Sequence, residues 1–293
     1  MAIKQSSFNR YMTVLRYGIL IVATFVSLFP FVWMLIAATN NTVAINAGSM
    51  TFGDQLMVNL GNLFNPDLGF ARAIVNSALI ALVTTVCALT VSSAAGYGFE
   101  IFRSKKRDIV FGILLVSMMV PFCALMIPLY RLFGTFGSLG FDDEGNPLAP
   151  WKWMGLDSYF AVVIPLVATA FLIFLFRQNT KAFPKDILEA ARIDGLSEIA
   201  IFFKVYFPVM RPTYAAAAII TFMGSWNNFL WPLVALQSPE MRTVPLVLSN
   251  MGSSYTPDYG MIMCGIVFAT LPTAAIFFLM QKYFVAGMVG AVK

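Results

Sequence analysis

The residues with the clearest chemical potential form one short polar segment, Glu189-Ala-Ala-Arg-Ile-Asp-Gly195. It lies between long apolar runs. Ala190 and Ala191 are small enough for another surface to approach closely, and Glu189 and Asp194 can cap a helix or pair with arginines of a partner. An amphipathic hairpin lying on lipid is the alternative, but its acidic residues would face an anionic leaflet. The pattern therefore favours docking of another protein.

A second candidate group is Trp226, Asn227, Asn228 and Trp231, inside an apolar run. Asparagine amides suit sugar hydroxyls, and indole faces suit the apolar faces of sugar rings. The alternative is structural, with amides bonding neighbouring helices and tryptophans anchored at the membrane interface. Both interpretations remain open. Asn76, Ser77 and Ser117 are weaker candidates that favour helix–helix contacts.

Several kinds of chemistry are missing from the sequence. The chain has no histidine and no CxxC pair, and Cys87, Cys123 and Cys264 lie in apolar runs, which argues against zinc, haem and histidine-based catalysis. No GxxxxGK[ST] phosphate-binding loop is present. We therefore expect no catalytic residue, no bound metal or cofactor, and no ATP hydrolysis by this chain itself.

The elements around these residues are expected to be membrane-spanning helices. The chain has 293 residues, of which 59% are hydrophobic and 11% charged, with a mean hydropathy of +0.79. A span needs about 20 apolar residues, and six runs are long enough: residues 17–38, 73–99, 109–129, 159–176, 213–236 and 259–280. The first is too long for the apolar core of a signal peptide. Prolines inside the last four predict kinks.

Orientation follows from the basic residues, of which 15 of 19 fall on the side that holds both termini. The positive-inside rule then places both termini in the cytoplasm. The net charge of +5 therefore reflects topology rather than nucleic-acid binding. Residues 177–212 form a long cytoplasmic loop that contains the polar segment.

Helix signals divide this loop into a helical pair. Pro184 suits a first helical position, and Gly195 suits a stop after a helix over residues 185–194. Ile187, Leu188 and Ala191 gather on one side of that helix. Ser197 can cap a second helix that runs to about Phe207, before Pro208. Its apolar stripe is expected to contain Ile199, Phe202, Phe203 and Tyr206.

The loop resembles the EAA loop of bacterial ABC importer permeases. The matching residues are Glu189, Ala190, Ala191, Asp194, Gly195 and Pro208, while Val205 and Phe207 replace the more usual Ile and Leu. Three further segments resemble the carbohydrate-uptake branch, and within it the MalG-like permease of maltose-type importers: Pro121-Phe-Cys-Ala-Leu-Met-Ile-Pro128, Gly224-Ser-Trp-Asn-Asn-Phe-Leu-Trp-Pro232 and Phe284-Val-Ala-Gly-Met-Val-Gly-Ala-Val-Lys293.

This resemblance implies an all-α fold of six transmembrane helices with a cytoplasmic coupling helix pair. We expect a cytoplasmic N-terminus (1–16), a permease domain (17–281, containing the 177–212 loop) and a cytoplasmic tail (282–293). In such a family the coupling helix docks on an ATPase subunit, and the tail lies near the ATPases. The expected location is the bacterial plasma (inner) membrane.

The resemblance also implies the partners and the substrate. They are a second six-span permease forming a heterodimer, two cytoplasmic ABC ATPase subunits that use ATP and Mg, an extracytoplasmic solute-binding protein, and a sugar, with oligosaccharides as the default. Because no evident basic patch lines the spans, a neutral sugar is favoured over a glycerol phosphate ester. The rival functions are an ion-coupled secondary carrier and a channel subunit. The spans contain no carboxylate or histidine for a proton relay, whereas a sodium-coupled carrier could use backbone carbonyls at broken helices. A channel would need no charged cytoplasmic lever.

Overall fold

The computed structural model describes residues 2–138 and 151–290. Within these residues the regular structure is helical throughout, without strands. The chain divides into two compact units, one formed by the residues up to Leu68 with Leu248–Thr270, the other by Gly69–Val247 with the segment from Leu271. The prediction of an all-helical chain is confirmed.

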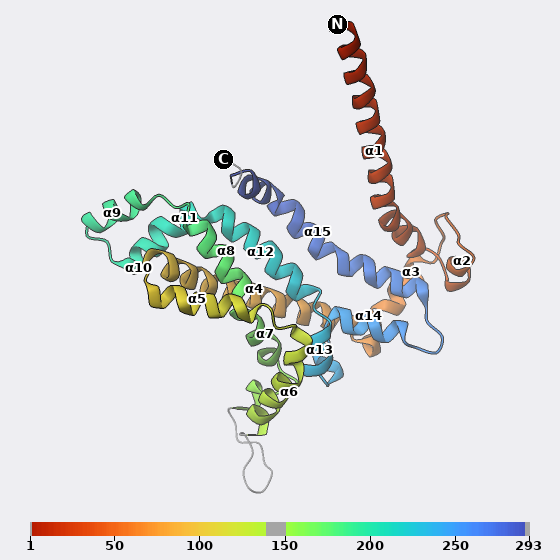
Figure 1. The fold of residues 1–293 in the computed structure, drawn as a ribbon. Helices are drawn as coiled ribbons and strands as arrows, with labels where there is room; N and C mark the ends of the chain where they lie inside the picture. Colours follow the sequence, from red (N-terminus) through yellow and green to blue (C-terminus); the bar gives the residue numbers. More distant parts are fainter. Residues whose placement is uncertain (1, 139–150, 291–293) are drawn as a thin grey trace. The chain divides into compact units, whose positions relative to one another are not determined.

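The first unit contains α1 (Ala2–Ala37), α2 (Thr42–Asn46), α3 (Leu56–Leu63) and the first part of α15 (Tyr259–Gly290) (Figure 1). Asn59 ties its segments together by donating from Nδ2 to the carbonyls of Ala38 and Asn40, both at 3.0 Å. Gly260 lies against this junction. A Cβ at Gly260 would stand 2.3 Å from the Asn40 carbonyl oxygen, so only glycine fits there.

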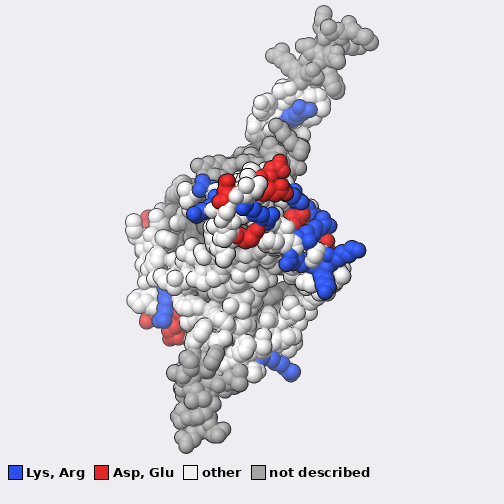
Figure 2. Space-filling view, turned by 90° about the vertical axis from the view of Figure 1, so that its left-hand side faces the viewer, with Lys and Arg blue, Asp and Glu red and all other residues white. Residues whose placement is uncertain are grey.

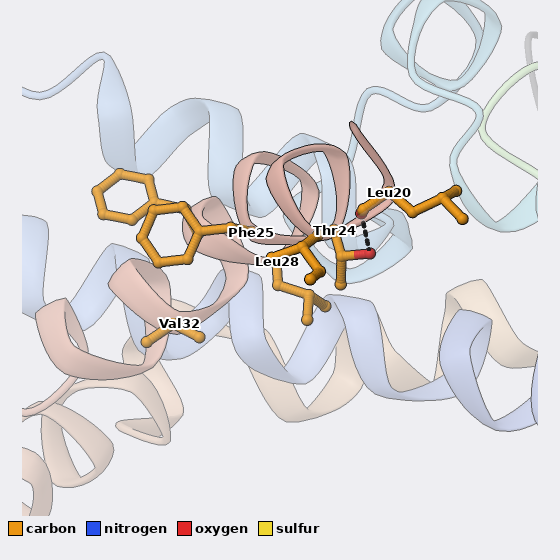
Figure 3. Close-up of a pocket in the computed structure, with 7 residues that line it drawn as sticks. Leu20, Thr24, Phe25, Leu28 and Val32 are labelled. Carbon is orange, nitrogen blue, oxygen red and sulfur yellow. Dashed lines mark hydrogen bonds between the residues drawn. The ribbon is translucent and has the colours of Figure 1, made fainter. Parts of the chain in front are cut away.

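Helix α1 presents an open apolar surface. Figure 3 shows Leu20, Phe25, Leu28 and Val32 projecting from it, around a shallow pocket. The Thr24 hydroxyl donates to the Leu20 carbonyl at 2.7 Å and so exposes no unpaired donor. This surface is typical of a membrane-spanning helix.

The second unit is built around α4 (Phe70–Ile101), which contacts α7 (Tyr159–Val167), α8 (Ala170–Thr180) and α12 (Arg211–Trp226). Helices α4 and α8 approach closely at Gly96, where a Cβ would lie 2.6 Å from Cβ of Phe176. The shorter helices α13 (Leu230–Ala235), η4 (Pro239–Met241) and η2 (Trp151–Met154) also belong to this unit, and α14 (Val244–Gly252) begins in it.

Four helices are long and apolar enough to cross a membrane: Met12–Ala37, Phe70–Ile101, Tyr159–Thr180 and Tyr259–Leu279. They match the first, second, fourth and sixth predicted spans. The third predicted span is a bent pair, α5 (Lys105–Ser117) and α6 (Phe122–Ser138), with an angle of 100° between Lys105–Ser117 and Phe122–Phe136. The bend falls just before Pro121, which disfavours helical backbone at the preceding residue.

The fifth predicted span is divided between α12 and α13, and neither helix is long enough by itself to cross a membrane. The described residues therefore contain four helices that are long and apolar enough to cross a membrane, or five if the bent pair counts as one span. Pro272 does not interrupt α15, which continues to Gly290. Of the predicted tail, residues 282–290 belong to this helix and residues 291–293 lie outside the described part.

Candidate functional site

Charged side chains gather at one end of the second unit. Figure 2 shows Lys, Arg, Asp and Glu concentrated on the face that carries α9 (Lys185–Ile193), α10 (Glu198–Ile201) and the start of α5. This face contains the polar segment singled out from the sequence. We call residues 185–209 the loop helices.

The first loop helix, α9, ends in a Schellman motif. Gly195 has φ of +79°, its amide donates to the Arg192 carbonyl at 3.0 Å, and the Leu196 amide donates to the Ala191 carbonyl at 3.1 Å. The predicted glycine stop is confirmed. Pro184 is the N-cap rather than the first helical residue, and Asp194 is the C-cap.

The second loop helix begins as predicted, with the Ser197 hydroxyl accepting from the Ala200 amide at 3.3 Å. It does not stop before Pro208. The chain widens into a π-helical turn, η3 (Phe202–Tyr206), and continues through α11 (Phe207–Val209) into α12. Proline lacks an amide hydrogen and its ring collides with the carbonyl four residues earlier, so a wider turn accommodates Pro208 inside the helix.

The two loop helices bury different residues from those that the apolar stripe predicts. In α9, Leu188 and Ala191 are buried, whereas Ile187 is exposed. In the second helix Ile201 and Tyr206 are buried, but Ile199 and Phe203 remain 73% and 61% exposed. The stripe prediction is therefore wrong for Ile199 and Phe203. Ile201 and Tyr206, five residues apart across the wide turn, share the buried face, so an i, i+3, i+4, i+7 pattern does not mark it.

The exposed side of the loop helices combines apolar and charged side chains. Ile193 is 86% exposed, and Glu189, Ala190 and Asp194 are exposed as well. Of the alanine pair, only Ala190 faces outward, since Ala191 packs inward. Large exposed apolar side chains on a charged, non-spanning segment are typical of a protein-docking surface.

The loop helices are packed rigidly onto the spans. Tyr206 is fully buried, and its hydroxyl lies 2.7 Å from Oγ1 of Thr180 in α8. Because the Thr180 hydroxyl already donates to the Phe176 carbonyl at 2.7 Å, Tyr206 is the donor. Burial raises the pKa of Tyr206, which keeps this donor protonated. One core cluster is continuous from α9 and α10 into α4, α8 and α12, and contains Leu188, Ala191, Ile201, Tyr206, Tyr97, Phe176 and Ala217.

An ion pair closes the turn between the loop helices. Nε of Arg192 donates to Oε1 of Glu198 at 2.7 Å, and the Tyr97 hydroxyl donates to Oε2 at 3.1 Å. Arg192 lowers the pKa of the Glu198 carboxyl, although desolvation acts in the opposite direction. Glu198 is thus engaged within the chain and is not a free docking carboxylate. The role of Tyr97 has no signal in the sequence, because the contact joins residues 101 positions apart.

A buried arginine at the end of α8 is a second feature that the sequence pattern missed. Nε of Arg177 donates to Oε2 of Glu100 at 3.2 Å, and its Nη2 also pairs with Asp108. The guanidinium carbon lies 4.1 Å from the centre of the Phe111 ring, a cation–π geometry. Arg177 therefore links the ends of α4, α5 and α8 directly before the loop helices begin.

The four pathway candidates lie at the break between α12 and α13 but have different environments. Trp231 is fully buried, and its Nε1 donates to the Ala161 carbonyl at 2.8 Å. Pro165, four residues after Ala161, cannot supply an amide hydrogen, so the indole fills a bond that the proline leaves open. Trp226 is also buried, stacked on Phe222.

The two asparagines at this break are more accessible. Asn227 is exposed, and its Nδ2 donates to the Met223 carbonyl at 2.9 Å, while Asn228 is half-buried. Of the four candidates, these amides are better placed to meet a ligand than the tryptophans.

Asn76 and Ser77 hold the opposite end of α4. Nδ2 of Asn76 donates to the carbonyls of Glu240 and Arg242 at 2.8 and 2.9 Å, and Oδ1 accepts from the Tyr159 hydroxyl at 2.8 Å. The Ser77 hydroxyl accepts from the Val244 amide at 2.8 Å. Both side chains make the interhelical contacts favoured from the sequence. Among the described residues, no group of three His, Cys, Asp or Glu side chains is arranged to hold a metal.

Comparison with known proteins identifies the family of this chain. Residues 88–290 match the family described as "Binding-protein-dependent transport system inner membrane component". The chain is 47% identical over 285 residues to the lactose transport system permease protein LacG of Rhizobium radiobacter, covering 97% of this chain and 98% of LacG. It is 40% identical over 232 residues to the arabinooligosaccharides transport system permease protein AraQ of Bacillus subtilis (strain 168), covering 79% and 76%.

A more distant relative is the sn-glycerol-3-phosphate transport system permease protein UgpE of Escherichia coli (strain K12), 29% identical over 292 residues and covering 97% of this chain and 98% of UgpE. The fold is similar to that of a bacterial ABC transporter chain involved in import of the acidic polysaccharide alginate, with a TM-score of 0.80, 20% identity, and coverage of 94% and 97%. The chain belongs to the family of binding-protein-dependent transport system inner membrane components, which are permease subunits of ABC importers.

Proposed function

We propose that this chain forms half of the membrane pathway of an ATP-driven importer of neutral oligosaccharides. LacG and AraQ, the relatives of 47% and 40% identity, are named for lactose and arabinooligosaccharides, whereas UgpE, at 29%, is named for a phosphate ester. No Lys, Arg, Asp or Glu occurs in the six apolar runs. Within the membrane these runs would offer an anionic substrate no countercharge, which favours a neutral substrate.

The proposed assembly is a heterodimer with a second six-span permease, two cytoplasmic ATPase subunits and an extracytoplasmic binding protein, in a bacterial inner membrane. In this arrangement α12 and α13 together cross the membrane as a broken fifth span, and α5 with α6 cross as the third. Both termini and the loop helices lie in the cytoplasm, in accordance with the basic residues of α5 and residues 177–211.

The loop helices are proposed to dock on an ATPase subunit through Glu189, Ala190, Asp194 and the exposed Ile193. The observation that carries this proposal is the continuous core from Leu188 and Ile201 to Phe176 and Ala217. Displacement of the loop helices by an ATPase would be transmitted to α4, α8 and α12 rather than absorbed by a flexible loop, since close-packed interiors deform little. Gly195 and Pro208 shape the pair, and the partner subunits bind the ATP and Mg.

The experiment is uptake into proteoliposomes that contain the full complex, with its binding protein outside and ATP inside. We expect labelled lactose to accumulate only with hydrolysable ATP and binding protein present. Accumulation driven by a sodium or proton gradient without ATP would contradict the proposal and indicate an ion-coupled carrier. Rapid equilibration without accumulation would indicate a channel.

A further inference from the structure

A cavity of about 260 Å³ lies in the second unit, at the break between α7 and α8. It is lined from three directions, by Thr84 in α4, by Thr169 and Leu172 at the start of α8, and by Gly224 and Ser225 near the end of α12. Thr84 lies near the middle of a helix that is long and apolar enough to span a membrane. The cavity therefore lies at membrane depth.

Two hydroxyls of this cavity are buried without a hydrogen-bond partner among the described residues. Thr84 is 0% exposed and Ser225 is 7% exposed, and neither side-chain oxygen is bonded. Thr169 precedes α8, but its side chain makes no capping bond. A buried hydroxyl without a partner costs free energy, above all where water is scarce.

Other hydroxyls on the same helices are satisfied locally. Thr85, Thr90 and Thr221 each donate to the carbonyl four residues earlier, at 2.6 to 2.8 Å. Thr84 and Ser225, like Ser92 in α4, do not follow this pattern. Thr84 and Ser225 differ from Ser92 because they come from different helices yet line one cavity. This coincidence indicates that their partner is a molecule inside the cavity.

We propose that this cavity is a subsite for one neutral sugar ring on the import pathway, with Thr84 and Ser225 as hydrogen-bonding partners of its hydroxyls. The proposal rests on the proposed transport of neutral sugars and adds a site apart from Trp226, Asn227, Asn228 and Trp231. Serine and threonine hydroxyls both donate and accept, as sugar hydroxyls do. The apolar wall, with Leu172 and the half-exposed Phe171, suits the apolar face of the ring.

The size and charge of the cavity restrict what it binds. Its volume is far larger than the roughly 30 Å³ of one water and slightly below the roughly 300 Å³ at which ligand pockets commonly begin. One ring of an oligosaccharide is therefore expected inside, with the remainder outside. No lining residue is charged, so a phosphate would be buried without a cation, at high cost. The subsite thus selects neutral sugars over phosphate esters.

The test uses the full reconstituted complex with labelled lactose as the probe. Thr84→Val and Ser225→Ala remove each hydroxyl with little change in shape. Their matched controls are Thr243→Val and Ser92→Ala, which remove hydroxyls that are equally buried and unpartnered but do not line the cavity. We expect the cavity variants to raise the KM of lactose uptake about two- to tenfold each, as for a lost neutral hydrogen bond. The controls and the ATP hydrolysis without sugar should be unchanged.

A filling variant provides a second measurement. A Cβ at Gly224 meets nothing within 4 Å, so Gly224→Leu should fit without disturbing the backbone and occupy the cavity. We expect it to assemble normally, to hydrolyse ATP at the basal rate, and to lose lactose uptake at least tenfold.

The outcomes separate the subsite from the proposed function. The subsite would be overturned if Thr84→Val and Ser225→Ala kept the wild-type KM and Gly224→Leu took up lactose normally. The proposed function would then remain intact. The subsite would also be overturned if the cavity and control variants showed equal shifts in thermal stability and no change in KM. The buried hydroxyls would then have a structural or water-binding role. A wild-type complex that transports sn-glycerol 3-phosphate but no neutral sugar would overturn both.

Discussion

The hydroxyl of Tyr97 donates to Oε2 of Glu198 at 3.1 Å, which ties a membrane-spanning helix to the first residue of α10. The other carboxylate oxygen of Glu198 is held by Arg192 of α9 at 2.7 Å. The ring of Tyr97 also packs edge-on against Phe202 and Tyr206, with centroids 5.4 and 4.9 Å apart. One tyrosine thereby connects α4 to both loop helices.

The Glu198 contacts predict a pH dependence. Because Arg192, against the effect of desolvation, lowers the pKa of Glu198 in the folded chain, the carboxylate contributes stability at pH values above its unfolded pKa of 4.5. That contribution is lost as the pH falls through the folded pKa. Thermal unfolding of the purified complex between pH 7 and pH 3 should show it, and Glu198→Gln should reduce the slope. An identical slope in Glu198→Gln would contradict the assignment.

Tyr206→Phe should loosen the loop helices without changing the spans. The variant removes the donor to Thr180 Oγ1 and leaves the ring in place, at a cost of about 1 kcal/mol. Hydrogen exchange of the amides in α9 and α10 should become faster, whereas those in α4 should keep their protection. Tyr255→Phe is the control, because Tyr255 is fully exposed. Unchanged exchange in Tyr206→Phe would show that the hydroxyl contributes nothing.

Gly195 is required for its backbone conformation rather than for space. A Cβ at this position would meet no atom within 4 Å, but the φ of +79° is unfavourable for residues with a Cβ. Gly195→Ala should destabilise the loop by about 1–2 kcal/mol, and Gly195→Asn by less. Gly112→Ala, in ordinary helix with equal space, is the control. Thermal unfolding measures all three, and equal effects of Ala at both positions would contradict this explanation.

Among the described charged residues, Arg177 should be the one whose substitution lowers the stability of the chain most. Its side chain is 7% exposed and that of Glu100 is 6% exposed, so Arg177→Met leaves a buried carboxylate unpaired. We expect the free energy of unfolding to fall by about 3–5 kcal/mol in Arg177→Met, and Arg177→Met/Glu100→Gln to recover part of that loss. Arg103→Met breaks an exposed pair with Asp108, which water screens, and should change the stability far less than Arg177→Met. Similar melting temperatures for Arg177→Met and Arg103→Met would contradict the buried-pair assignment.

Features set by local chemistry were predictable from the sequence. The stop at Gly195 and the cap at Ser197 depend on residues within a few positions, and both occur as expected. The long apolar runs likewise predict four spanning helices directly. The bend before Pro121 was predicted in position, although its angle depends on the packing of α6 against α13 and η2.

Features set by long-range packing were not predictable. Ile199 and Phe203 face outward in a helix that contains the π-turn before Pro208, and a 3.6-residue periodicity predicts neither the turn nor these exposures. Trp231 was a candidate for ligand contact, but its indole bonds a carbonyl 70 residues away that Pro165 leaves open. The cavity hydroxyls Thr84 and Ser225 were missed for the same reason, because they meet only when α4 and α12 pack together.

The coupling role of the loop helices is tested most directly at Ala190, which is exposed on α9. The measurement is sugar-stimulated ATP hydrolysis and ATPase co-purification for Ala190→Trp, compared with Ala71→Trp at an exposed alanine at the start of α4. We predict that Ala190→Trp keeps the second permease but loses the ATPase subunits and the stimulated hydrolysis, whereas Ala71→Trp keeps all three. Full ATPase binding and stimulation by Ala190→Trp would contradict the coupling role.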